Sequence, residues 1–283
     1  MILFILCLFV AITILVFFRL FEKFGIDNLQ AILLSYLVSG LASFLISDWR
    51  INIAEIPQQD WFIYTFIIGI SFFIGFSTFA LSIQKSGLAI TSVAANISVI
   101  IPVSIAIILY GESLNTWQIG GLIIALISII LVFKPKDKTK FSLSTLIFPM
   151  ALFFINGLNN SLMKHTEQLQ AMNQPMLFLG LVFISAFFTG LLYYIFKTDK
   201  TPFQKKNLIA AIILGLLNFT STYLFLASLS IFDSSVFFPI FNLSFIGGSA
   251  LIGAFVFKEK LSLINWTGLI LAIFAIVLIT YFQ

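Results

Sequence analysis

YGESLNTWQIGGLIIAL (Tyr110–Leu126) and FKEKLSLINWTGLILAI (Phe257–Ile273) are two versions of one stretch, separated by an offset of 147 residues. Six of the fifteen positions from Glu112 to Leu126 are identical in the second copy. The identical residues are Glu112, Leu114, Gly121, Leu122, Ile123 and Ala125, which match Glu259, Leu261, Gly268, Leu269, Ile270 and Ala272. The chain is therefore an internal duplication. Because each copy lies within a series of long apolar runs, the repeated unit is a set of membrane helices, an organisation typical of transporters.

The composition excludes a water-soluble protein. Of 283 residues, 60% are hydrophobic and 9% are charged, and the mean hydropathy is +1.13, whereas soluble domains carry about 25% charged residues. The net charge of +4 does not indicate a nucleic-acid partner, because the lysines cluster in short loops between apolar runs, where they act as orientation signals. With one cysteine, Cys7, and one histidine, His165, the chain has too few soft ligands for a structural zinc site. We expect no metal and no cofactor.

Ten apolar segments each approach the length of about 20 residues that crosses a bilayer. They are Ile2–Phe18, Leu29–Ile46, Trp61–Ile83, Leu88–Leu109, Trp117–Phe133, Leu146–Met163, Met176–Phe196, Leu208–Leu229, Ser235–Phe257 and Ile264–Phe282. The first segment lacks the basic start and small-residue cleavage site of a signal peptide, so we expect it to be retained. The long polar connector Lys134–Thr145 separates two groups of five spans. We therefore expect a first repeat over residues 1–133, a basic linker over 134–145 and a second repeat over 146–283.

The distribution of lysine and arginine predicts the orientation in the membrane. Because five is odd, the second repeat must enter the membrane from the opposite side, which makes the halves inverted repeats. Arg50 and Lys164 lie on the side reached after even-numbered spans, and the other thirteen basic residues lie on the opposite side. These thirteen are Arg19, Lys23, Lys85, Lys134, Lys136, Lys138, Lys140, Lys197, Lys200, Lys205, Lys206, Lys258 and Lys260. By the positive-inside rule, the odd-numbered loops are cytoplasmic and both termini are outside.

The two halves resemble the drug/metabolite transporter superfamily in its EamA branch. The resemblance rests on a Glu-x-Leu element that closes the fourth helix of each half, GESLNTWQIGG with Glu112 and KEKLSLINWTG with Glu259, and on the helix openings ALSIQKSGLAITS at Ala80 and ASLSIFDSSVFFP at Ala227. It implies transport of small metabolites, amino acids, sugars or amphipathic compounds through a central cavity without nucleotide, with the fifth and tenth helices peripheral. Ten-helix members of this superfamily usually have both termini in the cytoplasm, whereas the charges of this chain indicate the reverse.

Several motifs are absent from the sequence, and their absence argues against an enzyme. The chain has no G-x-x-x-x-G-K-[ST] loop for nucleotide phosphates, and neither H-E-x-x-H nor G-x-S-x-G for hydrolysis. No Asp or Glu lies in the middle of a span. Small multidrug exporters of the same superfamily depend on a glutamate buried in the first helix, and Ile2–Phe18 has none. We therefore expect facilitated diffusion or exchange rather than proton antiport.

The candidate cavity residues are polar but mostly uncharged. Two sets of polar or small residues recur at the three- or four-residue spacing of a helix, so each set shares one helix face. The first set is Ser71, Gly75, Thr78 and Ser82, and the second is Asn156, Asn160 and Lys164. The substrate-binding candidates are Tyr36, Ser71, Thr78, Asn96, Asn156, Asn160, Lys164, Asn218, Thr222 and Asn242. Asparagine is costly in hydrocarbon unless it finds partners, so these residues must face protein or water. Pro102 and Pro239 are expected to interrupt the fourth helix of each half.

Structural roles compete with binding for several of these residues. The serines Ser35, Ser39 and Ser43 favour helix packing, and interhelical hydrogen bonds would satisfy the asparagines as well as cargo would. Lys164 and His165 lie near a helix end, where they can extend to the interface. Glu112 and Glu259 each precede a helix start, where a carboxylate pairs with free amides, so we expect them to be structural helix-end acids.

Taken together, the sequence predicts an all-α polytopic membrane protein with ten transmembrane helices in two inverted five-helix repeats, located in the plasma membrane, which in bacteria is the inner membrane. We expect a secondary transporter of small metabolites working by alternating access. A lipid-carrier flippase or its accessory subunit, and a membrane scaffold without transport, are the alternatives. The expected partners are a small-molecule substrate and the lipid bilayer, with no nucleic acid, and association into homodimers is left open.

Overall fold

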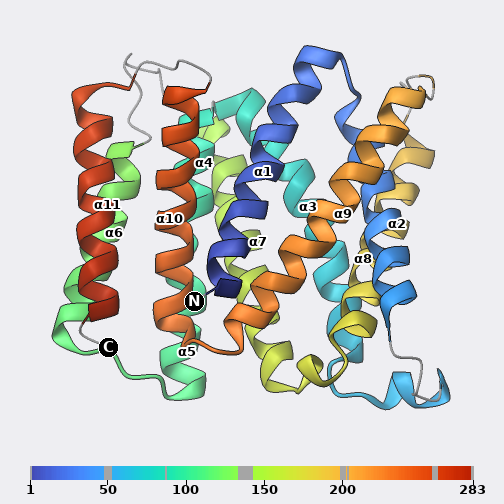
Figure 1. Cartoon of the computed structure of the whole chain (residues 1–283), viewed down its shortest axis with the longest axis horizontal. Coiled ribbons are helices and arrows are strands. Elements are labelled where there is room, and N and C mark those ends of the chain that lie inside the picture. Colours follow the sequence, from blue (N-terminus) through green and yellow to red (C-terminus); the bar gives the residue numbers. More distant parts are fainter. Residues whose placement is uncertain are drawn as a thin grey trace. The chain divides into compact units, whose positions relative to one another are not determined.

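The structure, a computed structural model, describes residues 2–47, 53–86, 88–132, 143–197, 202, 204–256 and 261–281. Every regular element in these residues is a helix (Figure 1). The chain divides into two compact units, and each unit combines segments from both halves of the sequence. Unit 1 contains residues 1–73 and 162–231, and unit 2 contains residues 74–161 and 232–283. The sequence repeats are therefore interleaved in the folded protein.

Unit 1 is built around α2. Its elements are α1 (Ile2–Phe24), α2 (Asn28–Ile46), η1 (Ile53–Gln58), the first part of α3 (Phe62–Ser86), the last part of α7 (Leu143–Gln168), η2 (Ala171–Asn173), α8 (Pro175–Phe196) and α9 (Lys205–Leu229). The helix α2 packs against α8 and α9, and α1 packs against α9. A Cβ atom at Gly40 would lie 2.8 Å from Ile184, and one at Gly190 would lie 2.9 Å from Leu33. Residues later in α2 therefore contact residues earlier in α8, so the two helices are antiparallel.

One end of unit 1 is fixed by a polar network whose central residues, Gln30 and Asn207, are buried. The side-chain amide of Asn207 donates to Gln30 Oε1 at 2.7 Å, and Asn207 Oδ1 accepts the backbone amide of Asp27 at 3.2 Å. Asp27 in turn accepts the backbone amide of Gln30 and caps α2. Lys206 Nζ donates to the carbonyl of Phe24 at 3.1 Å. These bonds hold the turn between α1 and α2 against the start of α9.

Unit 2 has its apolar core between α6, α10 and α11. Its elements are the remainder of α3 and α7, α4 (Leu88–Ile97), α5 (Ile100–Tyr110), α6 (Thr116–Val132), α10 (Ser234–Phe255) and α11 (Leu263–Tyr281). The core cluster consists of Ala125, Ile129, Val132, Leu243, Ile246, Leu269, Ala272 and Ala275. It draws on residues from both halves of the sequence, so neither half could bury this surface alone.

The helices α6 and α11, which carry the repeated stretch, lie side by side (Figure 1). A Cβ atom at Gly121 would lie 2.7 Å from Ile279, and a Cβ atom at Gly268 would lie 2.6 Å from the backbone nitrogen of Val132. Gly268 and Ile279 follow Gly121 and Val132 at the same 147-residue offset, so the two contacts are equivalent. The start of each helix meets the end of the other. The last helices of the two repeats are therefore antiparallel, as inverted repeats require.

Eight helices in the described residues are long and apolar enough to cross a membrane, and the apolar segments Ile2–Phe18 and Thr116–Val132 are shorter. These segments coincide with the ten spans expected from the sequence, the fourth being formed by α4 and α5 together. The predicted fold class, an all-α polytopic membrane protein, is confirmed.

The expectation that a proline interrupts the fourth helix of each half is wrong for the second half. In the first half, the helix breaks at Ser98 and Val99, and Pro102 follows as the third residue of α5. A proline in the first turn lacks only an amide that would have no partner there. In the second half, α10 runs without interruption through Pro239. Because Pro239 is the sixth residue of α10, only about one turn of helix precedes it, and there is little to kink.

Candidate functional site

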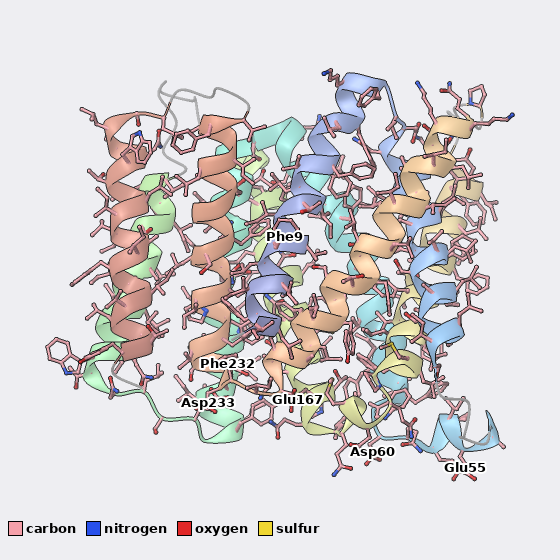
Figure 2. All side chains as sticks on the ribbon, in the orientation of Figure 1. Phe9, Glu55, Asp60, Glu167, Phe232 and Asp233 are labelled. Carbon is pink, nitrogen blue, oxygen red and sulfur yellow. The ribbon has the colours of Figure 1, made fainter. Side chains whose placement is uncertain are left out.

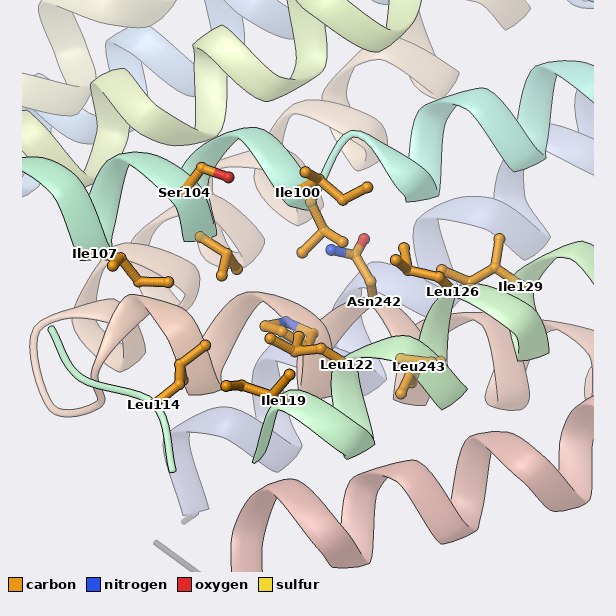
Figure 3. A pocket seen from close by; sticks show the side chains of 14 residues that line it. Ile100, Ser104, Ile107, Leu114, Ile119, Leu122, Leu126, Ile129, Asn242 and Leu243 are labelled. Carbon is orange, nitrogen blue, oxygen red and sulfur yellow. The ribbon is translucent and has the colours of Figure 1, made fainter. Parts of the chain in front are cut away.

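A cavity of about 290 Å³ lies in unit 2 where α4 ends and α5 begins (Figure 3). Its wall is mostly aliphatic and comes from Val99 and the first turns of α5, from Leu114, from α6 and from α10. The residues are Val99, Ile100, Val103, Ser104, Ile107, Leu114, Ile119, Leu122, Ala125, Leu126, Ile129, Pro239, Asn242 and Leu243. None of these lining residues is charged. The cavity is thus suited to an apolar group rather than to an ion.

Two lining residues supply hydrogen-bonding groups. Asn242 projects from α10 toward the α5 side of the cavity (Figure 3). Its side-chain nitrogen donates to the carbonyl of Phe238 at 2.9 Å, which leaves its carbonyl oxygen as an acceptor. Ser104 lies on α5. The sequence selected Asn242 because it follows a proline in an apolar helix, but it gave no reason to select Ser104, a serine within an aliphatic run.

Asn96 lies beside the helix break and does not line this cavity. Its side-chain nitrogen donates to the carbonyl of Ser92 at 2.7 Å, one turn earlier in α4. At the break itself, the hydroxyl of Ser98 donates to the carbonyl of Ala95 at 2.6 Å, and Val99 N–H donates to the carbonyl of Asn96 at 3.3 Å. Side chain and backbone thus satisfy carbonyls that the interruption of the helix releases.

A second polar region of unit 2 is the face of α7 that carries Asn156 and Asn160. Both side chains are half-buried, and in the described part of the chain no group forms a hydrogen bond with either. A Cβ atom at Gly75 of α3 would lie 3.9 Å from Asn156 Oδ1. Asn156 therefore lies next to Gly75, a member of the α3 stripe that the sequence identified.

The other members of the α3 stripe are partly satisfied within the protein. The hydroxyl of Ser71 donates to the carbonyl of Ile68 in its own helix at 2.9 Å. Ser82 and Thr91 share a hydrogen bond of 2.7 Å that joins the end of α3 to α4. Thr78 is half-buried. Ser82 thus has a packing role.

Besides Ser71 and Lys164, three further candidates lie in the helices of unit 1. Tyr36 is buried in α2 and stacks on Phe183 of α8 with ring centroids 6.3 Å apart. Asn218 and Thr222 are half-buried on neighbouring turns of α9, and within the described residues neither side chain has a hydrogen-bond partner. The serine stripe of α2 is used for packing, since Ser39 donates to the carbonyls of Ser35 and of Gly215 in α9.

Lys164 forms an ion pair with a residue that the sequence analysis missed. Its Nζ lies 2.9 Å from Glu167 Oε2, and the Lys164 residue is only 7% exposed. The spacing of three residues on one helix is the signal that could have revealed this pair. Next to it, His165 Nε2 lies 3.2 Å from the Tyr64 hydroxyl, which joins α7 to α3.

Three of the acids in unit 1 lie together at one end of the unit. Figure 2 shows Glu167 at the same end of unit 1 as Asp60 and Glu55. Lys23 and Lys206 lie at the opposite end, next to the turn between α1 and α2. This arrangement agrees with the assignment of loops after odd-numbered and even-numbered spans to opposite sides of the membrane, on which the count of basic residues depends.

Glu112 pairs with a helix start, but not with the one that follows it in the sequence. Its carboxylate accepts the backbone amides of Ser234 at 3.0 Å and Ser235 at 2.8 Å, at the start of α10. Helix α6 has its own reciprocal cap. The side-chain oxygen of Asn115 accepts the backbone amide of Gln118, and the side-chain oxygen of Gln118 accepts the backbone amide of Asn115. Glu259 lies outside the described residues.

Comparison with known proteins gives the family. The sequence matches the EamA-like transporter family over residues 1–134 and again over residues 143–281. It is similar to a Haemophilus influenzae protein described as uncharacterised, with 24% identity over 205 residues, 71% of this chain and 69% of that protein. A crystal structure of a protein with 14% sequence identity has the same fold, with a TM-score of 0.73 over 98% of this chain and 96% of that one. The chain, a multi-pass membrane protein, therefore belongs to the EamA-like transporter family.

Proposed function

We propose that the protein is a secondary transporter of small polar or amphipathic metabolites, such as amino acids and related compounds, which works by alternating access without nucleotide hydrolysis. The observation that carries the proposal is the pair of half-buried amides on α7, Asn156 and Asn160, which form no hydrogen bond within the described part of the chain. A membrane scaffold would gain nothing from such groups, because an unpaired amide in an apolar surrounding costs about 1–3 kcal/mol. A transporter needs them, because cargo completes their hydrogen bonds.

The chemistry of these groups favours cargo without a strong net charge. An asparagine side chain offers two donors and one carbonyl acceptor, so it pairs with hydroxyls, amides, carboxylates or ammonium groups. The one basic side chain on this face, Lys164, is held by Glu167 at 2.9 Å. Its charge is compensated within the protein rather than presented to cargo.

The coupling that this arrangement supports is facilitated diffusion or exchange. Proton antiport through a carboxylate requires an acid in the membrane interior whose protonation changes during the cycle. The acids Glu112 and Glu167 lie at helix ends and each already has a partner. His165 pairs with Tyr64 next to the end of α7.

The experiment has two stages. A thermal-shift screen of the purified protein against metabolite pools identifies a ligand, and counterflow in proteoliposomes then measures its transport. Asn156→Ala and Asn160→Ala should each weaken apparent affinity by one to two decades, because a cargo group loses its partner. Leu158→Ala, an exposed position on the same helix, is the matched control and should transport normally.

Two results would overturn the proposal. If the asparagine variants melt at lower temperature yet transport normally, the amides are structural. If a fluorescent lipid changes leaflet in the same proteoliposomes and no metabolite is exchanged, the protein is a lipid-carrier flippase instead.

A further inference from the structure

The cavity of unit 2 opens on the outer surface of the helices that form it. Ile100, Ile107 and Ile119 line the cavity and are also 41%, 39% and 47% exposed. They belong to α5 and α6, so the opening lies between these two helices. Isoleucine is favourable in hydrocarbon, so an opening lined by exposed isoleucines is suited to the entry of an apolar molecule from the bilayer.

We propose that this cavity binds the aliphatic part of a neutral amphiphile that enters from the bilayer and donates one hydrogen bond to Asn242. This goes beyond the proposed transport, because binding here requires neither cargo nor alternating access.

The polar requirement follows from the orientation of the Asn242 amide. Its nitrogen must face the carbonyl of Phe238, 2.9 Å away, because two carbonyl oxygens cannot form a hydrogen bond with each other. The side-chain oxygen of Asn242 is left as an acceptor, and no described group donates to it. A ligand with a hydroxyl or an amide N–H supplies the missing donor. A pure hydrocarbon would leave the acceptor unpaired.

The electrostatic requirement follows from the rest of the wall. Apart from Asn242, Ser104 is the lining residue that carries a polar side chain, and the remaining lining residues are aliphatic or proline. No lining side chain carries a charge that could balance an ionised ligand. Moving an uncompensated charge into such surroundings is strongly unfavourable. The ligand is therefore uncharged in its bound form.

The volume sets the size of the ligand. A volume of about 290 Å³ is at the lower end of small-molecule pockets and corresponds to roughly ten water-sized groups. An eight-carbon alcohol matches this size and provides one donor. 1-Octanol is therefore the probe of choice. Two comparison compounds of the same chain length are octane, which lacks the hydrogen-bond donor, and octanoate, which carries a charge.

Photolabelling in nanodiscs tests the site directly. A diazirine-bearing octanol should label peptides of α5, α6 and α10, and unlabelled 1-octanol should compete. Octane should compete about fivefold to tenfold more weakly, because it cannot pair with Asn242. Octanoate at a pH where it is ionised should also compete poorly. Equal competition by octane and 1-octanol in the wild-type protein would overturn the proposal.

Matched variants separate the cavity from the general lipid-facing surface. Leu122→Trp should fill the cavity and abolish labelling, whereas Ile123→Trp, at a neighbouring position that is 55% exposed and does not line the cavity, should leave labelling unchanged. Asn242→Leu should keep labelling but lose the preference for 1-octanol over octane. Melting curves of each variant establish that it is folded. Labelling that persists in a folded Leu122→Trp protein would refute the site, and a protein that labels as expected but transports nothing would refute only the transport proposal.

Discussion

Gly121 of α6 lies so close to Ile279 of α11 that a Cβ atom at this glycine would come within 2.7 Å of the isoleucine side chain. The same approach recurs between Gly268 and Val132, one repeat later. Ser128 strengthens the contact by donating to the carbonyl of Gly268 at 2.7 Å. Without a hydrophobic driving force between helices in lipid, close packing of this kind is the main source of helix association.

A first prediction concerns this contact. Gly121→Ala should destabilise the protein by about 1–3 kcal/mol, because the added carbon forces Ile279 and its helix to move. Gly120→Ala is the matched control, since a Cβ atom there meets nothing within 4 Å. It should leave stability unchanged or raise it by up to about 1 kcal/mol through better helix propensity. Thermal melting in detergent measures both, and equal melting temperatures for the two variants would contradict the packing role of Gly121.

A second prediction concerns the cap of α10. Glu112→Ala removes the acceptor of the Ser234 and Ser235 amides and should lower stability by about 0.5–2 kcal/mol. Glu112→Gln keeps an acceptor but loses the charge that favours a helix N-terminus, so its loss should be smaller. Glu55→Ala, at an exposed acid of η1, is the control and should have little effect. The order of the three melting temperatures is the measurement, and a Glu112→Ala protein as stable as wild type would contradict the cap.

A third prediction concerns orientation. In a Cys7→Ser background, Gln170→Cys should react with a membrane-impermeant thiol reagent in intact cells, because it follows α7 at the end of unit 1 opposite to Lys23 and Lys206. Lys206→Cys should react only after the cells are permeabilised. Both side chains are exposed, so accessibility within the protein does not decide the result. The reverse pattern would place both termini in the cytoplasm and contradict the inference from the thirteen basic residues.

A fourth prediction concerns coupling. Counterflow of the identified substrate should continue when an ionophore collapses the pH gradient. His165→Gln should transport like wild type, because glutamine is uncharged and can still pair with Tyr64. Tyr64→Phe serves as the control for loss of the hydrogen bond alone. Accumulation that requires a pH difference and disappears in His165→Gln would establish proton coupling through this histidine.

Hydropathy was sufficient to predict the helices, because a membrane span must be both long and continuously apolar. It could not show that α4 and α5 are separate while α10 is continuous, since both segments contain a proline. What decides is where the proline falls within the span. Pro102 falls in the middle of the segment formed by α4 and α5, whereas Pro239 falls near the start of α10.

The site was partly predictable for a similar reason. Residues four apart share a face whatever the tertiary structure, so Asn156 and Asn160 could be identified from spacing. The spacing of residues along the sequence does not reveal hydrogen-bond partners that are far apart in the chain. A role for Glu112 at a helix start could be predicted, but not that the start belongs to α10, more than a hundred residues away in the chain.

The break at Ser98 and Val99 has no counterpart in α10, and for the alternating-access carrier proposed above this difference has an energetic consequence. Two identical inverted halves would make the inward-open and outward-open forms equal in free energy, since exchanging the halves converts one form into the other. A helix interrupted in one half alone removes that equality. We therefore expect an unequal resting population of the two forms, and hence unequal apparent affinities for the same cargo on the two sides.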